Sequence, residues 1–203
     1  MKIKQLNLQD VEDCLRLPEN DEVHVFLLPA HTIDNLHKSI HEAGHALLLQ
    51  ILSAYTGEPA ENLAFTKGAH GKPSLITDGT FPSIEFSLSH SGTYVALAFS
   101  AYAPVGIDIE DTSRNAMFDR VASHVFLPQE AAALSLFPEE EKRSCFFRLW
   151  TRTESFLKGI GTGLSVSFSD EKIQKEYSFW TTEEVPAPAG YTCCVSYRQP
   201  GSL

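Results

Sequence analysis

The sequence predicts an α+β protein built of two similar lobes, residues 1–103 and 104–203. The chain has 203 residues, a length that suits two domains of about 100 residues each. Hydrophobic residues make up 43% of the chain, so it can form a core and is not a disordered protein. Each half contains a long helical pattern and several strand-like runs, which predicts an antiparallel sheet packed with helices in each lobe.

The elements of the first half follow from apolar spacing and from turn residues. Residues 22–29 form an apolar run that ends at a proline, which predicts a buried strand. Residues 36–56 carry apolar side chains at helical spacing, and a glycine and a proline soon after predict the end of this helix. Residues 84–89 and 94–100 predict two strands of a hairpin, with a turn at residues 90–92.

The second half begins with a predicted strand at residues 105–109, after a short break that ends at a proline. Pro128 suits the first turn of a short helix. Residues 139–159 predict the longest helix, with three glutamates at its start and Gly159 at its end. Three further strands are predicted, at residues 165–168, 177–181 and 191–197.

Charge and composition exclude several classes of partner. The net charge is −10 and no basic stripe is present, which argues against nucleic acid as a partner. The first ten residues lack the apolar core of a signal peptide, and the longest apolar run, residues 46–52, is far shorter than the roughly 20 residues of a membrane span. The four cysteines show no metal-binding spacing, so we expect reduced thiols in a soluble, cytoplasmic protein without a membrane partner.

Two short segments carry the residues that indicate chemistry. Asp108 and Glu110 are two apart on a predicted strand and so lie on one face. Glu154 and Lys158 are four apart on the long predicted helix and share one side of it. Three carboxylates form an oxygen-rich site for a hard cation such as Mg²⁺, and a lysine beside them suits a phosphate. Taken singly, Asp108 and Glu110 would be a solvated strand face, and Glu154 and Lys158 would be an ordinary surface pair on a helix.

These segments resemble those of the 4′-phosphopantetheinyl transferases, in the larger, surfactin-type branch with two lobes in one chain. That family carries a Gly-Ile/Val-Asp-x-Glu strand and, later, a helix with the pattern Trp/Phe-x-x-Lys-Glu-x-x-x-Lys. Here 42 residues separate Asp108 from Trp150, which fits the family spacing. Three further segments match in the family's order: residues 71–73 (GKP), 86–92 (FSLSHSG) and 161–165 (GTGLS).

The resemblance implies a fold and a reaction. The two lobes would be related by a pseudo-twofold axis and would bind coenzyme A, the co-substrate, at their interface. The phosphopantetheine arm would move from coenzyme A to a serine of an acyl or peptidyl carrier protein, with release of 3′,5′-ADP. A two-lobed chain would form the whole site alone, so we expect a monomer.

The resemblance also implies roles for individual residues. Mg²⁺, with Mn²⁺ as the alternative ion, would be held by Asp108, Glu110 and Glu154. Glu154 would accept the serine proton directly or through a water, Lys158 would contact the phosphate or the leaving group, and Asp108 would act as a catalytic metal ligand. The coenzyme A contacts would be Lys72, Ser89, His90 and Lys158.

The sequence departs from the family pattern in its basic residues. Thr153 stands where the family has a lysine before the helical glutamate. The region that supplies basic residues for the coenzyme A 3′-phosphate, roughly residues 36–48, here contains Lys38, His37, His41 and His45. Histidines are largely uncharged near pH 7, so we expect weak or pH-dependent affinity for coenzyme A.

Two alternative functions remain open. The fold would also serve as a binding module for coenzyme A or a carrier protein without transfer activity. Residues 41–45 (HEAGH) satisfy the His-Glu-x-x-His pattern of zinc metalloproteases, with Glu42 as general base, although no third ligand is identifiable. Because carrier proteins are usually acidic, the cations expected to meet one are Arg114, Arg120, Arg143 and Arg148, which would otherwise be plain surface charge.

Overall fold

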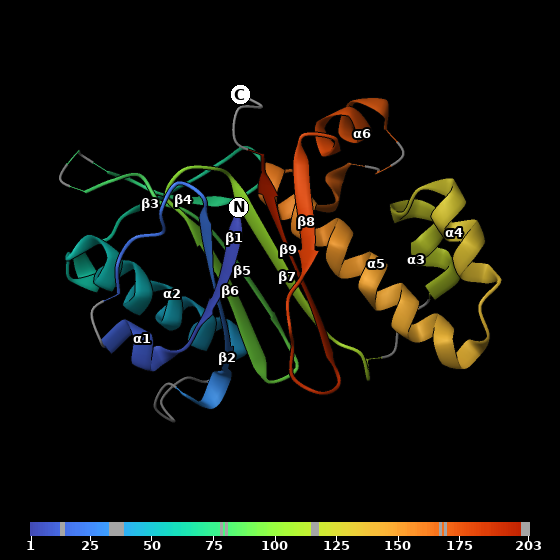
Figure 1. Ribbon diagram of the computed structural model, residues 1–203, viewed down its shortest axis with the longest axis horizontal. Helices are drawn as coiled ribbons and strands as arrows, with labels where there is room; N and C mark the ends of the chain where they lie inside the picture. Colours follow the sequence, from blue (N-terminus) through green and yellow to red (C-terminus); the bar gives the residue numbers. More distant parts are fainter. Residues whose placement is uncertain are drawn as a thin grey trace.

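The strands form three sheets in the computed structural model, which describes residues 1–12, 15–32, 39–77, 79, 81–114, 118–166, 168 and 170–199. The side chains of residues 118–120 are not part of this description. Figure 1 shows the strands in the middle of the molecule, with α2 on one side and α5, α3 and α4 on the other. The α+β class predicted from the sequence is confirmed. The division at residue 103 and the pseudo-twofold relation stay predictions.

The first half contains a four-stranded sheet of order β1-β2-β6-β5 and a separate pair, β3-β4. The four strands of the larger sheet are β1 (Lys2–Leu6), β2 (Glu22–Pro29), β5 (Glu85–Ser91) and β6 (Tyr94–Ser100). The pair consists of β3 (Phe65–Lys67) and β4 (Pro73–Leu75). The helical elements are α1 (Leu8–Glu12), η1 (Ala30–Thr32), α2 (Ile40–Thr56) and η2 (Ala60–Asn62).

The second half contains a three-stranded antiparallel sheet of order β7-β9-β8. Its strands are β7 (Val105–Asp111), β8 (Trp180–Glu184) and β9 (Tyr191–Arg198). Its helices are α3 (Phe118–Val125), α4 (Pro128–Ser135), α5 (Glu139–Ile160), η3 (Gly163–Ser165) and α6 (Glu171–Tyr177). Among the described residues of both halves, no helix is long and apolar enough to cross a membrane.

Local signals explain where the two long helices begin and end. Ser39 caps α2 by accepting the backbone N–H of Glu42, and Gly57 ends it with a φ of +75°. The predicted residues 36–38 of this helix lie outside the described residues. The helix α5 ends at Gly161, also at a φ of +75°, and not at Gly159 as the sequence predicts.

Some sequence predictions near the chain end and in the hairpin are wrong. His90 and Ser91 are the last residues of β5 rather than turn residues. Residues 163–165 form a 3-10 helix where a strand is predicted from residue 165, and residues 171–177 form α6 before β8 starts at Trp180. Short apolar runs do not distinguish strand from helix by periodicity alone. β1 also pairs with β2 in parallel, which departs from the antiparallel expectation.

The apolar core runs through the interface between the two larger sheets. One face of the four-stranded sheet packs on α2, whose Leu47, Ile51 and Leu52 are fully or almost fully buried. Its other face meets the three-stranded sheet, where valines and alanines of β2 and β6 pack against Val105 and Ile107 of β7. The described cysteines, Cys145, Cys193 and Cys194, are free thiols, as predicted.

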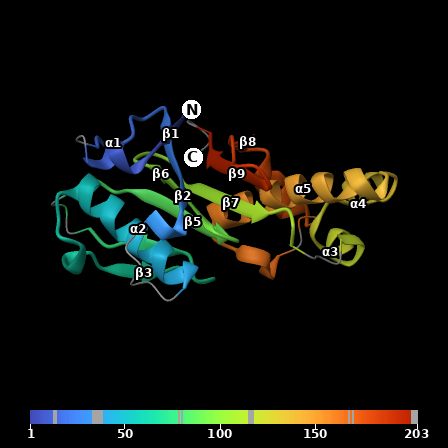
Figure 2. The ribbon, with the colours of Figure 1, turned by 90° about the horizontal axis from the view of Figure 1, so that it is seen from below.

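The edge strands β5 and β7 lie side by side between α2 and α5 (Figure 2). β7 alternates strictly: Val105, Ile107 and Ile109 enter the core between the sheets, while the residues between them face α5. The predicted strand thus places Asp108 on the face that meets the long helix. This alternation positions the candidate site.

Two glycines let α5 approach β7 very closely. A Cβ atom at Gly106 would lie 2.0 Å from the carbonyl oxygen of Ser155 and 2.3 Å from the amide nitrogen of Gly159. A Cβ atom at Gly159 would lie 2.4 Å from the ring of Trp180. The backbones of β7 and α5 are therefore in direct contact, which only glycine permits at these positions.

We expect Gly106→Ala to lower the free energy of unfolding by about 3 kcal/mol or more, because its Cβ would overlap backbone atoms that cannot rotate away. Urea denaturation measures this. Gly68→Ala is the matched control, since its Cβ would meet the carbonyl oxygen of Lys72 at an ordinary 3.6 Å. Equal stability of the two variants would contradict the close packing.

Candidate active site

Lys158 of α5 links the three elements that form the candidate site. Its Nζ atom lies 2.6 Å from Oδ1 of Asp108 on β7 and donates to the Ser89 hydroxyl of β5 at 2.8 Å. Glu154, one turn earlier on α5, lies 4.0 Å from the same Nζ. Burial alone would lower the pKa of Lys158, but the carboxylates of Asp108 and Glu154 outweigh it and raise the pKa, so the ammonium stays charged.

Asp108 is buried, with 3% of its surface exposed. Its Oδ1 atom accepts hydrogen bonds from Ser89 and Lys158, while Oδ2 has no partner among the described residues. Burial raises the pKa of Asp108 above its usual value, although Lys158 and Ser89 favour the ionised form. A buried carboxylate oxygen without a hydrogen-bond donor is an unusual feature in a folded protein, and it is suited to a bound cation.

Glu154 is the second carboxylate beside Lys158. Burial and the nearby charge of Asp108 raise the pKa of Glu154 to about 7. At neutral pH the carboxyl group is therefore close to half ionised. A group with a pKa near the working pH is suited to accept a proton from a substrate.

Glu110 is held by three donors, from β5, from α5 and from the turn after β7. Its Oε2 atom accepts from the Ser91 hydroxyl at 2.7 Å and from Nη1 of Arg114 at 2.9 Å. Its Oε1 atom accepts from Nε1 of Trp150 at 3.2 Å. Trp150 therefore donates to the site in addition to packing on Phe146 of the same helix. The motif spacing identifies Trp150 in the sequence, but not its hydrogen bond to Glu110.

The donor set fits a hard divalent cation in chemistry, because Asp108, Glu110 and Glu154 offer carboxylate oxygens and Oδ2 of Asp108 is unpaired. The three carboxylates are not, however, drawn to within 4.8 Å of one another in this structure. Lys158 lies between Asp108 and Glu154 and takes up part of the space. Among the described residues, the group that does satisfy this spacing is Glu19, Asp21 and Glu22.

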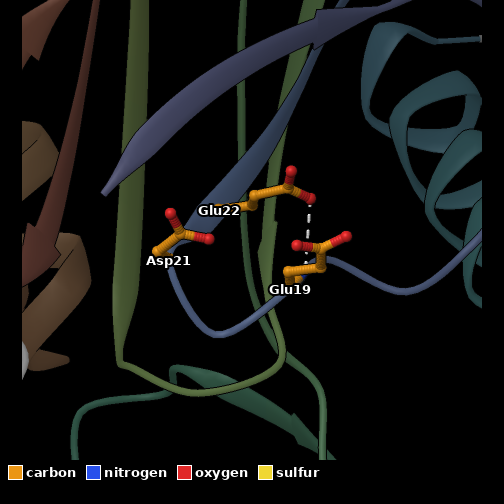
Figure 3. A group of neighbouring side chains, drawn as sticks. All are labelled: Glu19, Asp21 and Glu22. Carbon is orange, nitrogen blue, oxygen red and sulfur yellow. Dashed lines mark hydrogen bonds between the residues drawn. The ribbon is translucent and has the colours of Figure 1, made fainter.

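Glu19, Asp21 and Glu22 lie together at the start of β2 (Figure 3), and each of them pairs with a cation of the protein. Glu22 is buried and pairs with Lys4 and with Arg16, whose Nη2 atom is 2.9 Å from Oε2. The hydrogen bond from Lys4 is the main cause that lowers the pKa of Glu22 to about 2. The cations of the protein already neutralise this cluster, so we do not assign it a metal.

Parts of the three motif segments at residues 71–73, 86–92 and 161–165 come together around a cavity of about 260 Å³. The lining residues from the first half are His70, Gly71, Lys72, Pro73, Phe86, Ser87 and Leu88, and those from the second half are Lys158, Gly161 and Gly163. Both halves of the chain thus contribute to one cavity, and Lys158 connects it to the carboxylates. Ser89 and His90 are not among the lining residues.

Lys72 lies at the wall of this cavity with its charge directed at the backbone. Its Nζ atom donates to the carbonyl oxygens of Gly159 at 2.7 Å and Val105 at 3.1 Å. Burial lowers the pKa of Lys72, and Glu85 opposes this at 3.9 Å. Lys72 therefore ties the turn before β4 to both α5 and β7.

The histidines of the HEAGH segment lie on the surface of α2. The ring of His41 is 6.0 Å from the ring of His90, and the ring of His45 is 6.3 Å from that of Phe65. Burial, followed by the charges of His41 and Lys158, lowers the pKa of His90. The described part of the chain places no third metal ligand with His41 and His45, so nothing here favours a zinc protease.

Of the remaining sequence candidates, Arg114 pairs with Glu110, while the others make contacts outside the site carboxylates or none that the structure describes. Thr153 is fully buried, and its hydroxyl has no partner among the described residues. Arg152 pairs with Glu130 at 2.5 Å and so does not replace the expected lysine. Of the arginines proposed to meet a carrier protein, Arg148 pairs with Glu184 and Arg143 donates to the carbonyl oxygens of residues 112 and 114. The side chain of Arg120 lies outside the described residues.

We expect Glu154→Gln to stabilise the protein in the absence of metal by on the order of 2 kcal/mol at pH 8. The pKa of Glu154 is raised from 4.5 to about 7 in the folded state. Between these values the folded protein keeps a proton that the unfolded chain releases, so the free energy of unfolding decreases as the pH rises through this range. The gain should shrink toward pH 5, where the folded carboxyl is already neutral.

Urea denaturation with EDTA at both pH values measures this effect. Glu140→Gln, at the exposed start of the same helix, is the control and should change stability by less than about 0.5 kcal/mol at either pH. Destabilisation by Glu154→Gln at pH 8 would show that Glu154 contributes favourably as an anion and that its raised pKa is wrong.

Two family models match this chain, and both describe the family that its motifs resemble. Residues 104–191 match the model of the 4′-phosphopantetheinyl transferase superfamily, and residues 6–101 match that of the 4′-phosphopantetheinyl transferase N-terminal region. 4′-phosphopantetheinyl transferase HetI of Nostoc sp. is 31% identical over 158 residues, which cover 78% of this chain and 64% of that protein.

Two further relatives match much of the chain. 4′-phosphopantetheinyl transferase gsp of Aneurinibacillus migulanus is 35% identical over 132 residues, or 65% of this chain and 52% of that protein. 4′-phosphopantetheinyl transferase Sfp of Bacillus subtilis is 28% identical over 175 residues, or 86% and 69%. The chain thus spans about half to two thirds of the length of these three relatives.

Proposed function

Since the chain belongs to the 4′-phosphopantetheinyl transferase superfamily, we propose that it transfers the 4′-phosphopantetheine arm of coenzyme A to a serine of an acyl or peptidyl carrier protein. The observation that carries this proposal is the position of Lys158. It lines the cavity between the two halves and also contacts Asp108 beside Glu154, so a phosphate and the carboxylates would meet at one ammonium group.

Coenzyme A would bind in the cavity, with its pyrophosphate toward Lys158. The Lys72 side chain forms part of the wall, and the backbone of Gly71 allows close approach because no Cβ intervenes. His90 and His41 lie near one another on the N-terminal side and would meet a phosphate there. Because residues of both halves line the cavity, we propose that a monomer forms the complete site.

The carboxylates would act on the reacting phosphate. Asp108, Glu110 and Glu154 would hold Mg²⁺, or Mn²⁺, which supplies charge neutralisation at the pyrophosphate when bound. The carrier serine oxygen forms a bond to the phosphorus that bears the pantetheine arm, and the bond from this phosphorus to the bridging oxygen breaks. The electron pair of that bond leaves with 3′,5′-ADP.

Two side chains would manage charge and proton during this step. Glu154, with its pKa near 7, would accept the serine proton directly or through a water. Lys158 stays protonated and would donate a hydrogen bond to the phosphate or to the departing oxygen. Ser89 holds the Lys158 ammonium and the Asp108 carboxylate at the same hydroxyl, which limits their movement.

We expect the purified protein with coenzyme A and Mg²⁺ to add the phosphopantetheine mass to at least one of a panel of apo carrier proteins. Asp108→Ala and Glu154→Ala should each lower the rate about 100-fold or more while circular dichroism shows a folded protein. Asp111→Asn, on the same strand but outside the carboxylate set, should keep most of the activity.

The alternative of a binding module gives a different result in the same experiment. Coenzyme A that binds in calorimetry without a mass shift on any fatty-acid, polyketide or peptide carrier would support it. Full activity of Asp108→Ala would overturn the assignment of the carboxylates.

We also expect the Mg²⁺ concentration at half-maximal rate to rise as the pH falls from 8 to 6. Metal binding needs an ionised Glu154, whose pKa is about 7, so protons compete with the cation. The increase should be about tenfold in total from pH 8 to pH 6, most of it below pH 7, because a single proton with a pKa of about 7 competes with the cation. A half-saturation constant independent of pH in this range would contradict the role of Glu154 as a ligand.

A further inference from the structure

Three serines of β5 form a regular connection to β7. Ser87, Ser89 and Ser91 alternate along the strand, and all three are buried. β5 and β7 are each at the edge of their sheet, so every second N–H of β7 points away from its partner β9 and needs an acceptor. The serine hydroxyls accept these groups in order: Ile107 at 3.1 Å, Ile109 at 3.4 Å and Asp111 at 3.0 Å.

The chemistry of the neighbours determines where the proton of Ser89 points. Its oxygen accepts from the Ile109 N–H and from the Lys158 ammonium, and both of these groups are donors only. The single hydroxyl proton is left for Oδ1 of Asp108, at 2.7 Å. Ser89 thus joins a backbone N–H, a cation and a carboxylate.

Ser91 repeats this arrangement one step further along the strand. Its oxygen accepts from the Asp111 N–H and lies 3.4 Å from Nη1 of Arg114, another group that only donates. Its proton therefore points to Oε2 of Glu110, at 2.7 Å. Around Ser91, Glu110 is the carboxylate that accepts the hydroxyl proton, as Asp108 is around Ser89. Arg114 is the neighbouring cation, as Lys158 is around Ser89.

Ser87 has only the first of these functions. It accepts the Ile107 N–H, but the residue before Ile107 is Gly106, which has no side chain. At Ser89 and Ser91, the residue before the bonded N–H group carries a carboxylate, namely Asp108 and Glu110. The hydroxyl of Ser87 thus joins the strands without orienting an acid.

The surroundings of Glu110 show why Ser91 matters to its direction. Arg114 is 60% exposed and pairs with the same oxygen, Oε2, at 2.9 Å. An exposed arginine side chain is flexible, so without a second donor it would draw the carboxylate toward solvent. The buried hydroxyl of Ser91 and the Trp150 N–H oppose this by holding one oxygen each.

We propose that Ser91 is a positioning residue that directs the Glu110 carboxylate toward the cation site, in addition to joining β5 and β7. The proposal rests on the proposed function in so far as Glu110 is a metal ligand. Hydrogen bonds to a metal-binding carboxylate commonly change metal affinity 10- to 100-fold when they are removed, which is more than one bond between strands would change.

The test compares Ser91→Ala with Ser100→Ala in the full-length protein. Ser100 is buried at the end of β6, and its hydroxyl accepts the N–H of Ala103 at 3.1 Å. Each variant removes one buried hydroxyl that accepts a backbone N–H, so we expect both to lower the thermal midpoint by a similar amount. Mn²⁺ binding, followed by electron paramagnetic resonance with coenzyme A present, should weaken about tenfold or more in Ser91→Ala and stay within about twofold of wild type in Ser100→Ala.

A conservative variant separates positioning from folding. Ser91→Thr keeps a hydroxyl and should retain Mn²⁺ affinity close to wild type. Unchanged Mn²⁺ affinity in Ser91→Ala, or equal weakening in Ser100→Ala, would overturn the proposal.

Direct metal binding also distinguishes this proposal from the proposed function. A wild-type protein that binds Mn²⁺ but modifies no carrier, with weakened binding in Ser91→Ala, would support the role of Ser91 and argue against the transferase. Active transfer with full Mn²⁺ affinity in Ser91→Ala would remove the role of Ser91 alone. A wild-type protein that binds no Mn²⁺ with coenzyme A would overturn the metal assignment and this proposal together.

Discussion

The contact between β7 and α5 is the constraint on which the rest of the site depends. Gly106 and Gly159 let the strand and helix backbones touch, and Trp180 closes the far side of Gly159. This approach brings Lys158, one residue before Gly159, against Asp108, two residues after Gly106. Lys72 spans the same junction through the carbonyl oxygens of Val105 and Gly159. A wider spacing would separate the ammonium from the carboxylate and open the cavity wall.

The site concentrates charge where the protein is otherwise apolar, and this has an electrostatic cost. Asp108 and Glu154 have raised pKa values, mainly because burial disfavours their anions; repulsion from Glu110 adds to this at Asp108, and repulsion from Asp108 adds to it at Glu154. Lys158 and the serine hydroxyls offset part of this cost, yet Oδ2 of Asp108 keeps no partner among the described residues. Such incomplete compensation is typical of sites that bind a cation or handle a proton. The surface cluster of Glu19, Asp21 and Glu22 is the opposite case, since its neighbouring cations lower the pKa of Glu22.

The basic residues near the cavity differ from those that the family resemblance implies. His41 belongs to the region where the resemblance implies basic residues for the 3′-phosphate, and its ring lies 6.0 Å from that of His90, whose pKa is lowered by burial. Thr153 is fully buried inside the lobe, so its side chain does not face the cavity in this structure. Positive charge at the proposed phosphate site thus depends mainly on Lys158, which is also the ion-pair partner of Asp108.

The sequence by itself determined the class of fold, the strand at residues 22–29 and the face shared by Asp108 and Glu110, because these follow from local periodicity. Motif order also identified Lys158 and Glu154, since their spacing on one helix turn is visible in the chain. Only the tertiary structure decided what these side chains contact. Ser89 and Ser91 meet carboxylates 19 residues away, across two edge strands of different sheets, and no local pattern specifies such a pairing. The alternating serines were the available signal, but the N–H groups that they satisfy become unpaired only once β7 lies at the edge of its sheet.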